Sequence, residues 1–229
     1  LSFRPNVVSG EIYMNWQEIH KFDQAITLEI NSWDSSLTDH IWQFLSDVPA
    51  WIPMYVLIVA LLIWKLGWKR GLLVVLAAGL TFGFCDQFSN LIKDAVGRVR
   101  PLNDMFMLSN GLNVLEKGSS SYSFFSAHAA NAFGLATCTF TALRRILRPQ
   151  ISQCAVGAPT ADGKKSRCHM PGWLKAYGIW MFIWAPLVAI SRVFVGKHYL
   201  GDVLVGALAG MAAGYAFARL AAFLSQKIR

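Results

Sequence analysis

Charged residues are scarce in this chain. Only 15% of its 229 residues are Asp, Glu, Lys or Arg, whereas 55% are hydrophobic, and the mean hydropathy is +0.40. A soluble domain of this length typically carries about 25% charged residues. The composition therefore argues against an ordinary soluble domain. It predicts a single all-α domain over residues 1–229, built as a multi-pass transmembrane helix bundle.

Acidic residues are rarer than basic ones, with 13 Asp and Glu against 21 Lys and Arg, so the formal net charge is +8. A basic excess is also found in nucleic-acid-binding proteins, but the long apolar runs and nine Trp argue against that partner. An uneven distribution of Lys and Arg across a membrane explains the excess better. We therefore expect a lipid bilayer, and no nucleic acid, around this chain.

Cysteine is scarce too, with four residues in the whole chain. Cys85 and Cys138 fall in apolar runs, as small core residues do. Cys154 and Cys168 share a polar loop, but their spacing is not that of a zinc site. The pattern predicts free thiols at these positions.

Long apolar runs, by contrast, are present, and they predict about five membrane spans within residues 49–229. The expected spans are residues 51–64, 71–92, 126–143, 176–190 and 203–224, and a basic loop is expected over 144–175. In the last span, glycines recur at four-residue steps, at Gly206, Gly210 and Gly214. Such small residues on one helix face predict close helix packing rather than catalysis.

Residues 1–48 have a different pattern, in which apolar positions at helical spacing are mixed with polar ones. Two short amphipathic helices are expected here, around residues 22–33 and 41–45. Their mixed composition is typical of helices that lie in the membrane interface. We call residues 1–48 the interfacial collar.

The distribution of Lys and Arg predicts the orientation. Five alternating spans place Lys65–Arg70, the 144–175 loop and Lys227–Arg229 on one side, which the positive-inside rule makes cytoplasmic. The interfacial collar and the segments 93–125 and 191–202 then face the periplasm or exterior. A bacterial-type inner membrane is the expected location.

Three polar clusters fall on that outer side. The third of them, Ser191–Asp202, reads SRVFVGKHYLGD between two apolar runs. Its His198 and Asp202 are four residues apart, which on a helix places both side chains on one face. A carboxylate there accepts the imidazole N–H and leaves the other ring nitrogen free as a nucleophile or base.

The first two clusters lie at span ends. Lys93 and Arg100 are seven residues apart at the end of the second span, and would share a helix face if the helix continues to the Pro that follows Arg100. Ser126 and His128 open the third span, where backbone N–H groups form an anion site. The clusters hold too few carboxylates for a magnesium-dependent hydrolase. They indicate a phosphate site in which cations clamp the oxygens, one His attacks and the other protonates the leaving oxygen.

Three motifs in this order resemble the signature of the type 2 phosphatidic acid phosphatase superfamily of membrane lipid phosphatases. They are Lys93-x6-Arg100-Pro101, Ser126-Ala127-His128 and Ser191-Arg192-x5-His198-x3-Asp202. The second motif departs from the family pattern Pro-Ser-Gly-His, because Phe125 and Ala127 replace the Pro and the Gly. Ala127 keeps the backbone N–H that would contact phosphate.

The resemblance implies a role for each motif residue. It makes His198 the nucleophile that forms a phosphohistidine, Asp202 its orienting carboxylate and His128 the general acid. It assigns phosphate binding to Lys93, Arg100, Ser126, Ala127 and Arg192. It implies no metal and no cofactor, and leaves the oligomeric state open.

The implied substrate is a membrane lipid phosphate. The short five-span form with an interfacial collar is similar to undecaprenyl diphosphatases of the superfamily, so undecaprenyl diphosphate is the expected substrate. Lipid A phosphatase and phosphatidic acid or phosphatidylglycerophosphate phosphatase are the alternatives, and phosphotransfer to another acceptor is also open. A different class, a non-catalytic anion transporter, would use the cations as a binding ring.

Expectations also follow for four polar residues outside the motif positions. Arg98 is equally compatible with the phosphate clamp and with a loop anchor, and Asp86 within the second span is expected to hold Lys93 or an adjacent helix. Lys197, next to His198, is expected at the surface, with contact to the substrate as the alternative, and His20 is expected in the membrane interface.

Overall fold

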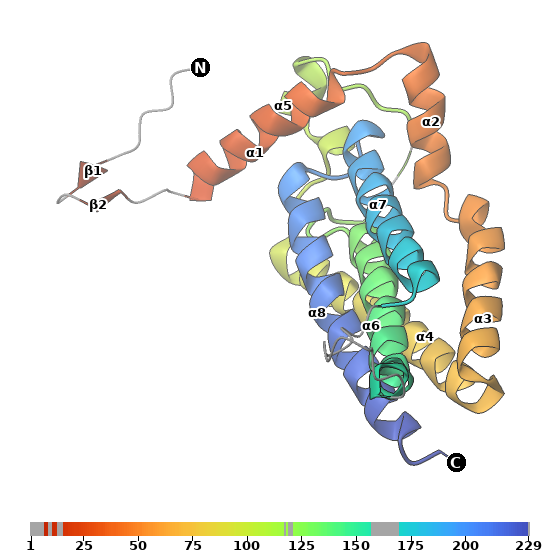
Figure 1. Ribbon diagram of the computed structural model, residues 1–229. Coiled ribbons are helices and arrows are strands. Elements are labelled where there is room, and N and C mark those ends of the chain that lie inside the picture. The colour runs from red at the N-terminus through yellow and green to blue at the C-terminus, as the bar shows by residue number, and fades with distance from the viewer. Residues whose placement is uncertain are drawn as a thin grey trace, which may run out of the picture.

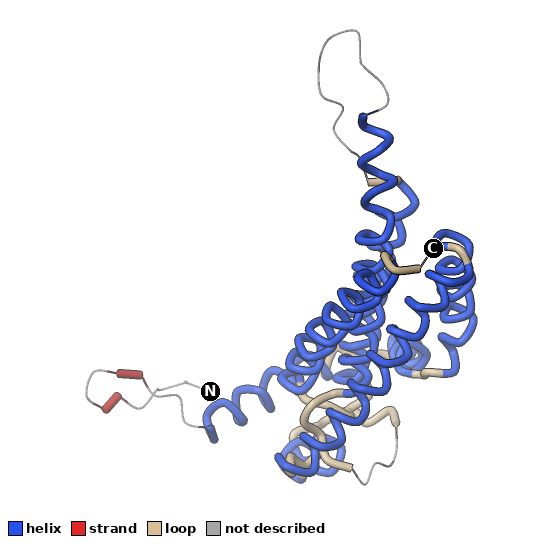
Figure 2. The backbone as a smooth tube through the Cα atoms, turned by 90° about the horizontal axis from the view of Figure 1, so that it is seen from below, coloured by secondary structure: helices blue, strands red, loops and turns tan. Residues whose placement is uncertain are grey.

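The computed structural model describes residues 7–8, 11–12, 16–116, 118, 121–156 and 170–228, with side chains left out for residues 7–12 and 149–156. Apart from a two-residue antiparallel pairing of β1 and β2, its regular elements are helical (Figures 1 and 2). In chain order they are β1 (Val7–Val8), β2 (Glu11–Ile12), α1 (Trp16–Asn31), α2 (Ser36–Ser46), η1 (Pro49–Trp51), α3 (Ile52–Leu66), α4 (Trp68–Val96), η2 (Pro101–Asn103), α5 (Met105–Ser109), α6 (Ala127–Val156), α7 (Gly172–Phe194) and α8 (Leu200–Ser225).

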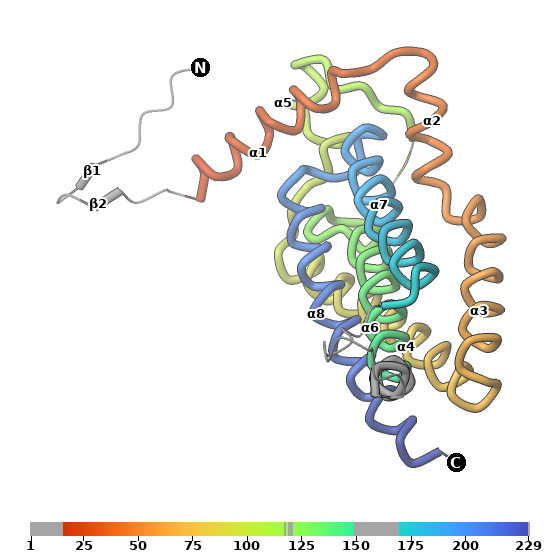
Figure 3. The backbone as a smooth tube through the Cα atoms, in the orientation of Figure 1, coloured from red at the N-terminus to blue at the C-terminus, as the bar shows by residue number. Residues whose placement is uncertain are grey.

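Helix α6 lies at the centre of the bundle and packs against α4, α7 and α8, while α3 lies at the edge against α4 (Figures 1 and 3). The contact between α6 and α8 depends on the predicted glycines. A Cβ atom on Gly210 would lie 2.1 Å from the carbonyl oxygen of Ala130, and one on Gly214 would lie 2.4 Å from that of Gly134. The glycines therefore let the two backbones touch, which confirms the packing prediction.

Four helical segments have the length and apolar character of a membrane crossing. They are Pro49–Leu66, Trp68–Ser109, Gly172–Phe194 and Leu200–Ser225. The remaining predicted span, α6, is 30 residues long but less apolar. Its neighbours enclose it, and small residues such as Ala129 and Ala136 are fully buried there, so it needs little lipid-facing surface. The lipid-facing helices instead expose large apolar side chains, such as Leu57 (69%) and Leu208 (64%).

Two sequence expectations about helix ends were wrong. Helix α4 ends at Val96, because Gly97 adopts a left-handed conformation (φ 63°) and donates its N–H to Lys93 O. Arg100 therefore does not continue the helical face of Lys93. At the other end of the bundle, α6 continues to Val156 through the first part of the predicted 144–175 loop, whose residues 157–169 lie outside the described residues.

The third correction concerns the segment Ser191–Asp202. Helix α7 ends at Phe194 and α8 begins at Leu200, so His198 lies before α8 rather than on it. The chain reverses between them at Gly196 (φ 78°), and the N–H groups of Lys197 and His198 both donate to Arg192 O at 3.1 Å. The i,i+4 pair is thus formed across a helix start.

Two expectations for the rest of the chain are confirmed. The interfacial collar contains two helices, α1 and α2, as its apolar spacing predicted. Cys85 and Cys138 are buried and free. Cys168 lies outside the described residues, as does the side chain of Cys154.

Candidate active site

A cavity of about 680 Å³ joins the three polar clusters. Its polar end is lined by Lys93, Arg100, Ala127, His128, Arg192, Lys197 and His198. Its opposite end is apolar and lies between α3, α4, α6 and α7, with lining residues such as Ile58, Leu62, Val75, Ala78, Leu135 and Trp184. Six of the eight predicted site residues therefore share one cavity, and the other two, Ser126 and Asp202, lie behind its wall.

His198 is almost fully buried, and its two ring nitrogens face different groups. Nδ1 lies 3.6 Å from Asp202 Oδ2 and 3.5 Å from Ser123 Oγ. Nε2 lies 3.3 Å from Arg100 Nη1 at the cavity. Because a guanidinium only donates, Nε2 is the acceptor and Nδ1 carries the proton. The arrangement leaves the lone pair of Nε2 toward the cavity.

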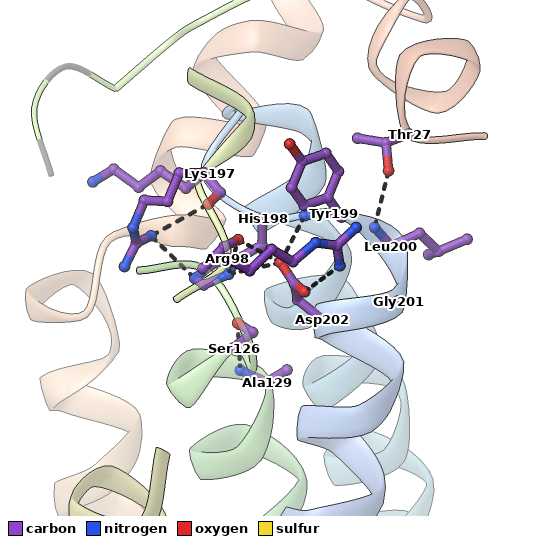
Figure 4. A network of polar contacts seen from close by, with 12 residues as sticks. Thr27, Arg98, Ser126, Ala129, Lys197, His198, Tyr199, Leu200, Gly201 and Asp202 are labelled. Atoms are coloured by element: carbon purple, nitrogen blue, oxygen red, sulfur yellow. Dashed lines mark hydrogen bonds and ion pairs between the residues drawn. The ribbon is translucent and has the colours of Figure 1, made fainter. Parts of the chain in front are cut away.

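Asp202 is held from several sides. Its Oδ2 accepts hydrogen bonds from Ser123 Oγ and from the backbone N–H of Tyr199, the latter at 3.1 Å. Its Oδ1 forms an ion pair with Arg98 Nη1 at 2.6 Å (Figure 4). The contact with Tyr199 N also caps the start of α8, so the helix start and the carboxylate beside His198 share one interaction.

Arg100 and Lys93, two of the cations at the polar end, donate hydrogen bonds to different groups. Arg100 donates from Nε to Ser121 O and from Nη2 to Ser121 Oγ, each at 2.8 Å, and from Nη1 to Lys197 O at 3.2 Å. Lys93 donates to Asn90 Oδ1 at 3.5 Å. Within the described residues Lys93 has no such bond with Asp86, which lines the cavity instead. Of the two partners expected for Asp86, the Lys93 side chain is therefore not hydrogen-bonded to it in the described part of the chain, and the other, an adjacent helix, stays a prediction.

Ser126 and the two residues after it open α6. The Ser126 N–H donates to Asp202 O at 3.0 Å, which ties the second motif to the third. The Ser126 hydroxyl is fully buried and accepts the Ala129 N–H at 3.4 Å (Figure 4), so it caps α6 rather than facing the cavity. Ala127 and His128 line the cavity. The first N–H groups of a helix have no partner within the helix, so the Ala127 N–H suits an anion.

Arg192 and Lys197 are bridged by a carboxylate that the sequence did not single out. Glu116 Oε2 lies 2.5 Å from Lys197 Nζ, and its Oε1 lies 3.5 Å from Arg192 Nη1. Ser46 of α2 donates to Glu116 Oε1 at 2.5 Å and also contacts Arg192 Nη1. Lys197 is only 17% exposed, so its expected position at the surface was wrong.

The electrostatics of the site favour a neutral His198. Burial lowers its pKa to about 4; Asp202 opposes this shift, whereas Arg100 and Arg192 add to it. The pKa of Glu116 is lowered, because hydrogen bonds from Lys197 and Ser46 and the charge of Arg192 outweigh the burial that opposes them. Near neutral pH the site therefore holds an uncharged imidazole beside a carboxylate-bridged pair of cations. Among the described residues, no group of three His, Cys, Asp or Glu has the arrangement of a metal site.

Several residues of this site lie outside the three motifs, so no motif pointed to them. Ser123 is three residues before Ser126, and Glu116 is in the polar loop that precedes it. Arg98 proved to be an anchor that pairs with Asp23 and Asp202, and it does not line the cavity that joins the three clusters. His20 proved to be its partner, with Nδ1 at 3.0 Å from Arg98 Nη2. Burial, the largest effect, and the neighbouring Arg98 both lower the pKa of His20, which fits its role as acceptor.

Comparison with known proteins agrees with this geometry. The family model described as the PAP2 superfamily matches residues 68–225. The chain is 28% identical to a lipid A 4'-phosphatase of Bacteroides thetaiotaomicron over 90% of this chain and 80% of the relative. It is 24% identical to a lipid A 4'-phosphatase of Porphyromonas gingivalis over 86% of this chain and 72% of the relative.

A solved structure has a similar fold. It is a transmembrane PAP2-type phosphatidylglycerolphosphate phosphatase from Bacillus subtilis, with a TM-score of 0.57 and 23% identity, covering 92% of this chain and 88% of the other.

Proposed function

Since this chain belongs to the PAP2 superfamily and is a membrane lipid phosphatase, we propose that it releases phosphate from a lipid monoester through a phosphohistidine on His198. The observation that carries the proposal is the position of His198 Nε2. It faces the cavity beside the Arg100 guanidinium, while Nδ1 faces Asp202. This gives an imidazole with a fixed tautomer, whose Nε2 lone pair faces the cavity and the Arg100 guanidinium, at the place where a phosphate would bind between the two.

The first step is attack of Nε2 on phosphorus. A bond forms between nitrogen and phosphorus as the bond from phosphorus to the lipid oxygen breaks. Arg100, Lys93 and Arg192 stabilise the charge on the phosphoryl oxygens, together with the Ala127 N–H. His128 gives a proton to the leaving oxygen, and Asp202 stabilises the positive charge that develops on the His198 ring.

The second step returns the enzyme to its starting state. Water attacks the phosphohistidine, and His128, now neutral, takes a proton from that water. The bond between nitrogen and phosphorus breaks, inorganic phosphate leaves, and His198 is neutral again. The cycle requires no metal and no oxidant. The proton that His128 gives to the leaving oxygen in the first step is replaced by the proton that it takes from water in the second.

The cavity supports a substrate with a lipid tail. Its lining on α6 runs from Ala127 to Thr139, a length of about 18 Å at 1.5 Å per residue. That length is about half the thickness of a bilayer's hydrocarbon core. A headgroup phosphate at the polar end would therefore leave its acyl or prenyl chain room within one leaflet.

Among lipid phosphates, we propose the phosphomonoester of a lipid A-type glycolipid as the substrate. Support comes from the two relatives, both lipid A 4'-phosphatases, which match this chain over most of its length. Undecaprenyl diphosphate, which the short five-span form favoured, stays a prediction. We also propose that the site opens to the periplasmic face of the inner membrane, as the Lys and Arg distribution predicts.

The test is phosphate release by the purified full chain in detergent with a chelator present. Lipid A, undecaprenyl diphosphate, phosphatidic acid and phosphatidylglycerophosphate are compared, with His198→Ala alongside. We expect release from lipid A that the chelator does not reduce and that His198→Ala abolishes. Release from another lipid in the panel would reassign the substrate. Equal release by wild type and His198→Ala, or no release at all, would overturn the mechanism and favour a non-catalytic anion-binding role.

A further inference from the structure

We propose that α1 is a positioning brace for the catalytic pair, acting through the polar stripe Asp23, Thr27 and Asn31. The inference rests on the proposed function, because it concerns how His198 and Asp202 are held for phosphoryl transfer. The three stripe residues recur every four positions, so they lie on one face of α1. Thr27 is 0% exposed and Asn31 is 1% exposed, although α1 lies at the edge of the bundle (Figure 1).

Asn31 holds the end of α7. Its Nδ2 donates to the carbonyl oxygens of Val193 at 3.1 Å and Phe194 at 3.0 Å. The last carbonyls of a helix have no partner within the helix, so an outside donor satisfies them. Asn31 Oδ1 accepts the Asn113 N–H at 2.7 Å, which ties the loop before Glu116 to the same point.

Thr27 and Asp23 hold the start of α8. Leu200 donates its N–H to Thr27 Oγ1 at 3.0 Å (Figure 4), and Gly201 donates its N–H to Asp23 Oδ1 at 2.8 Å. These are first-turn N–H groups, which also lack partners within the helix. A Cβ on Gly201 would lie 2.7 Å from Asp23 Oδ2, so the Asp23 side chain would have to shift to admit one. The stripe therefore fixes both ends of the segment that carries His198.

Arg98 connects the brace to the catalytic carboxylate. Its Nη2 lies 2.7 Å from Asp23 Oδ2 and its Nη1 lies 2.6 Å from Asp202 Oδ1. The guanidinium also stacks over the Tyr199 ring, 3.8 Å from its centre. Because Arg98 forms its ion pair with Asp202 Oδ1, Asp202 Oδ2 is the oxygen that faces His198 Nδ1. A planar guanidinium reaches two carboxylates at once, which a lysine ammonium does less well.

The outer face of α1 carries exposed aromatic residues. Trp16 is 68% exposed and Phe22 is 53% exposed, whereas two of the three stripe residues are buried. Charged residues such as Glu29 are exposed on α1 as well. Exposed aromatic and charged side chains together fit a helix that lies in the membrane interface, with its polar stripe on the catalytic segment Ser191–Asp202.

The first test compares Asp23→Ala with Glu29→Ala in the full chain, using the lipid that wild type hydrolyses. Both variants remove one carboxylate from α1, but Glu29 is exposed and its side chain does not bond to the catalytic segment. We expect Asp23→Ala to lower kcat about tenfold or more with KM within about twofold, because misplacing the nucleophile affects only the chemical step. We expect Glu29→Ala to match wild type. Equal kcat in the two variants would overturn the brace.

The second test separates positioning from mere folding, since a partly unfolded sample would also lose kcat. The charged and titratable groups around His198 are Asp202, Arg100, Arg192 and His128. In Arg98→Gln the charge of Asp202 on the His198 ring is no longer offset, so the pKa of His198 rises. The acid limb of kcat/KM then moves to higher pH. Arg98→Lys keeps the charge, so the acid limb of its kcat/KM should return to the pH of wild type, whereas its kcat should recover only in part.

Controls make each outcome decisive. If Asp23→Ala has a lower Tm, Asp23→Asn replaces it, and an unchanged kcat in that variant contradicts the brace. An unmoved acid limb in Arg98→Gln at normal Tm also contradicts it. An inactive wild type, or a His198→Ala variant as active as wild type, overturns the proposed function and the brace with it. An active wild type with unaffected Asp23 and Arg98 variants overturns the brace alone.

Discussion

Arg100 Nη1 lies 3.3 Å from His198 Nε2, so the guanidinium covers the ring nitrogen that faces the cavity. A phosphate bound between the two groups would meet the nucleophile and a charge-assisted donor together. We predict that Arg100→Lys lowers kcat/KM about 100-fold or more, since one well-placed donor to a transition state is worth about that much. Steady-state kinetics on the lipid substrate measures it. Lys65→Arg, the reverse exchange at a distant site, is the control, and similar kinetics in the two variants would contradict the role.

The pH dependence follows from the pKa of His198. The folded-state pKa of about 4 lies below the ordinary value of 6.5, mainly because of burial. The ring must be neutral to attack, so we predict that the acid limb of kcat/KM lies near pH 4, with an alkaline limb from loss of the proton on the general acid. A profile from pH 3.5 to 9 measures it. An acid limb at the ordinary histidine value would contradict the assignment.

The same shift affects stability. Below 6.5 the unfolded chain binds a proton at His198 that the folded chain does not bind until the pH is about 4. The unfolded state thus binds more protons in this window, and stability falls as pH decreases through it. We predict that Tm decreases from pH 6.5 to 4 and that His198→Gln reduces this decrease. Melting curves in detergent at each pH measure both. An equal decrease in wild type and variant would contradict the prediction.

Glu116 neutralises two cations that a phosphate would otherwise meet. It lies 2.5 Å from Lys197 and 3.5 Å from Arg192. Removing its charge leaves both cations available to an anion. We predict that Glu116→Gln lowers the inhibition constant for inorganic phosphate by about threefold to tenfold, the scale of a partly exposed ion pair. Product-inhibition kinetics measures it, with Glu29→Gln as the matched control. Weaker or unchanged inhibition would show that Glu116 does not compete with the phosphate.

The apolar end of the cavity is the predicted site of the lipid tail. Ala78 of α4 lines it and is not one of the phosphate-binding residues. We predict that Ala78→Trp raises KM for the lipid by about tenfold, because the indole fills space that the tail would occupy. Its kcat/KM for water-soluble p-nitrophenyl phosphate should be unchanged. Loss of both activities in a folded variant would place the tail elsewhere.

Packing between α6 and α8 sets a limit on residue size. A Cβ on Gly210 would lie 2.1 Å from Ala130 O, whereas a Cβ on Gly83 would meet nothing within 4 Å. We predict that Gly210→Ala destabilises the protein by about 1–3 kcal/mol, and that Gly83→Ala leaves it within about 0.5 kcal/mol. Melting curves in detergent compare them. Equal Tm values would mean that the helices separate at little cost.

Much of the fold was predictable because helices and spans follow from local patterns. The apolar runs located α3, α4, α7 and α8, and the small residues of α8 predicted its packing. The predictions failed where local geometry overrides a periodic pattern. Gly97 ends α4 before Arg100, and Gly196 places His198 ahead of α8. The His198–Asp202 pair forms nonetheless, because a residue before a helix start still lies one turn from the third helical residue.

The sequence by itself determined that the chain spans a membrane and which cations and histidines share a site. Both follow from the apolar runs and from the order and spacing of the motifs. Only the tertiary structure decided which atoms meet. Arg98 contacts Asp202 across 104 positions, and Asp23 contacts Gly201 across 178. A periodic pattern carries information over a few residues, whereas these contacts depend on how α1 and the segment after α4 pack against the start of α8. The contacts of α1 and the Glu116 bridge therefore could not be predicted from the sequence, because only the fold brings these residues near the segment that carries His198.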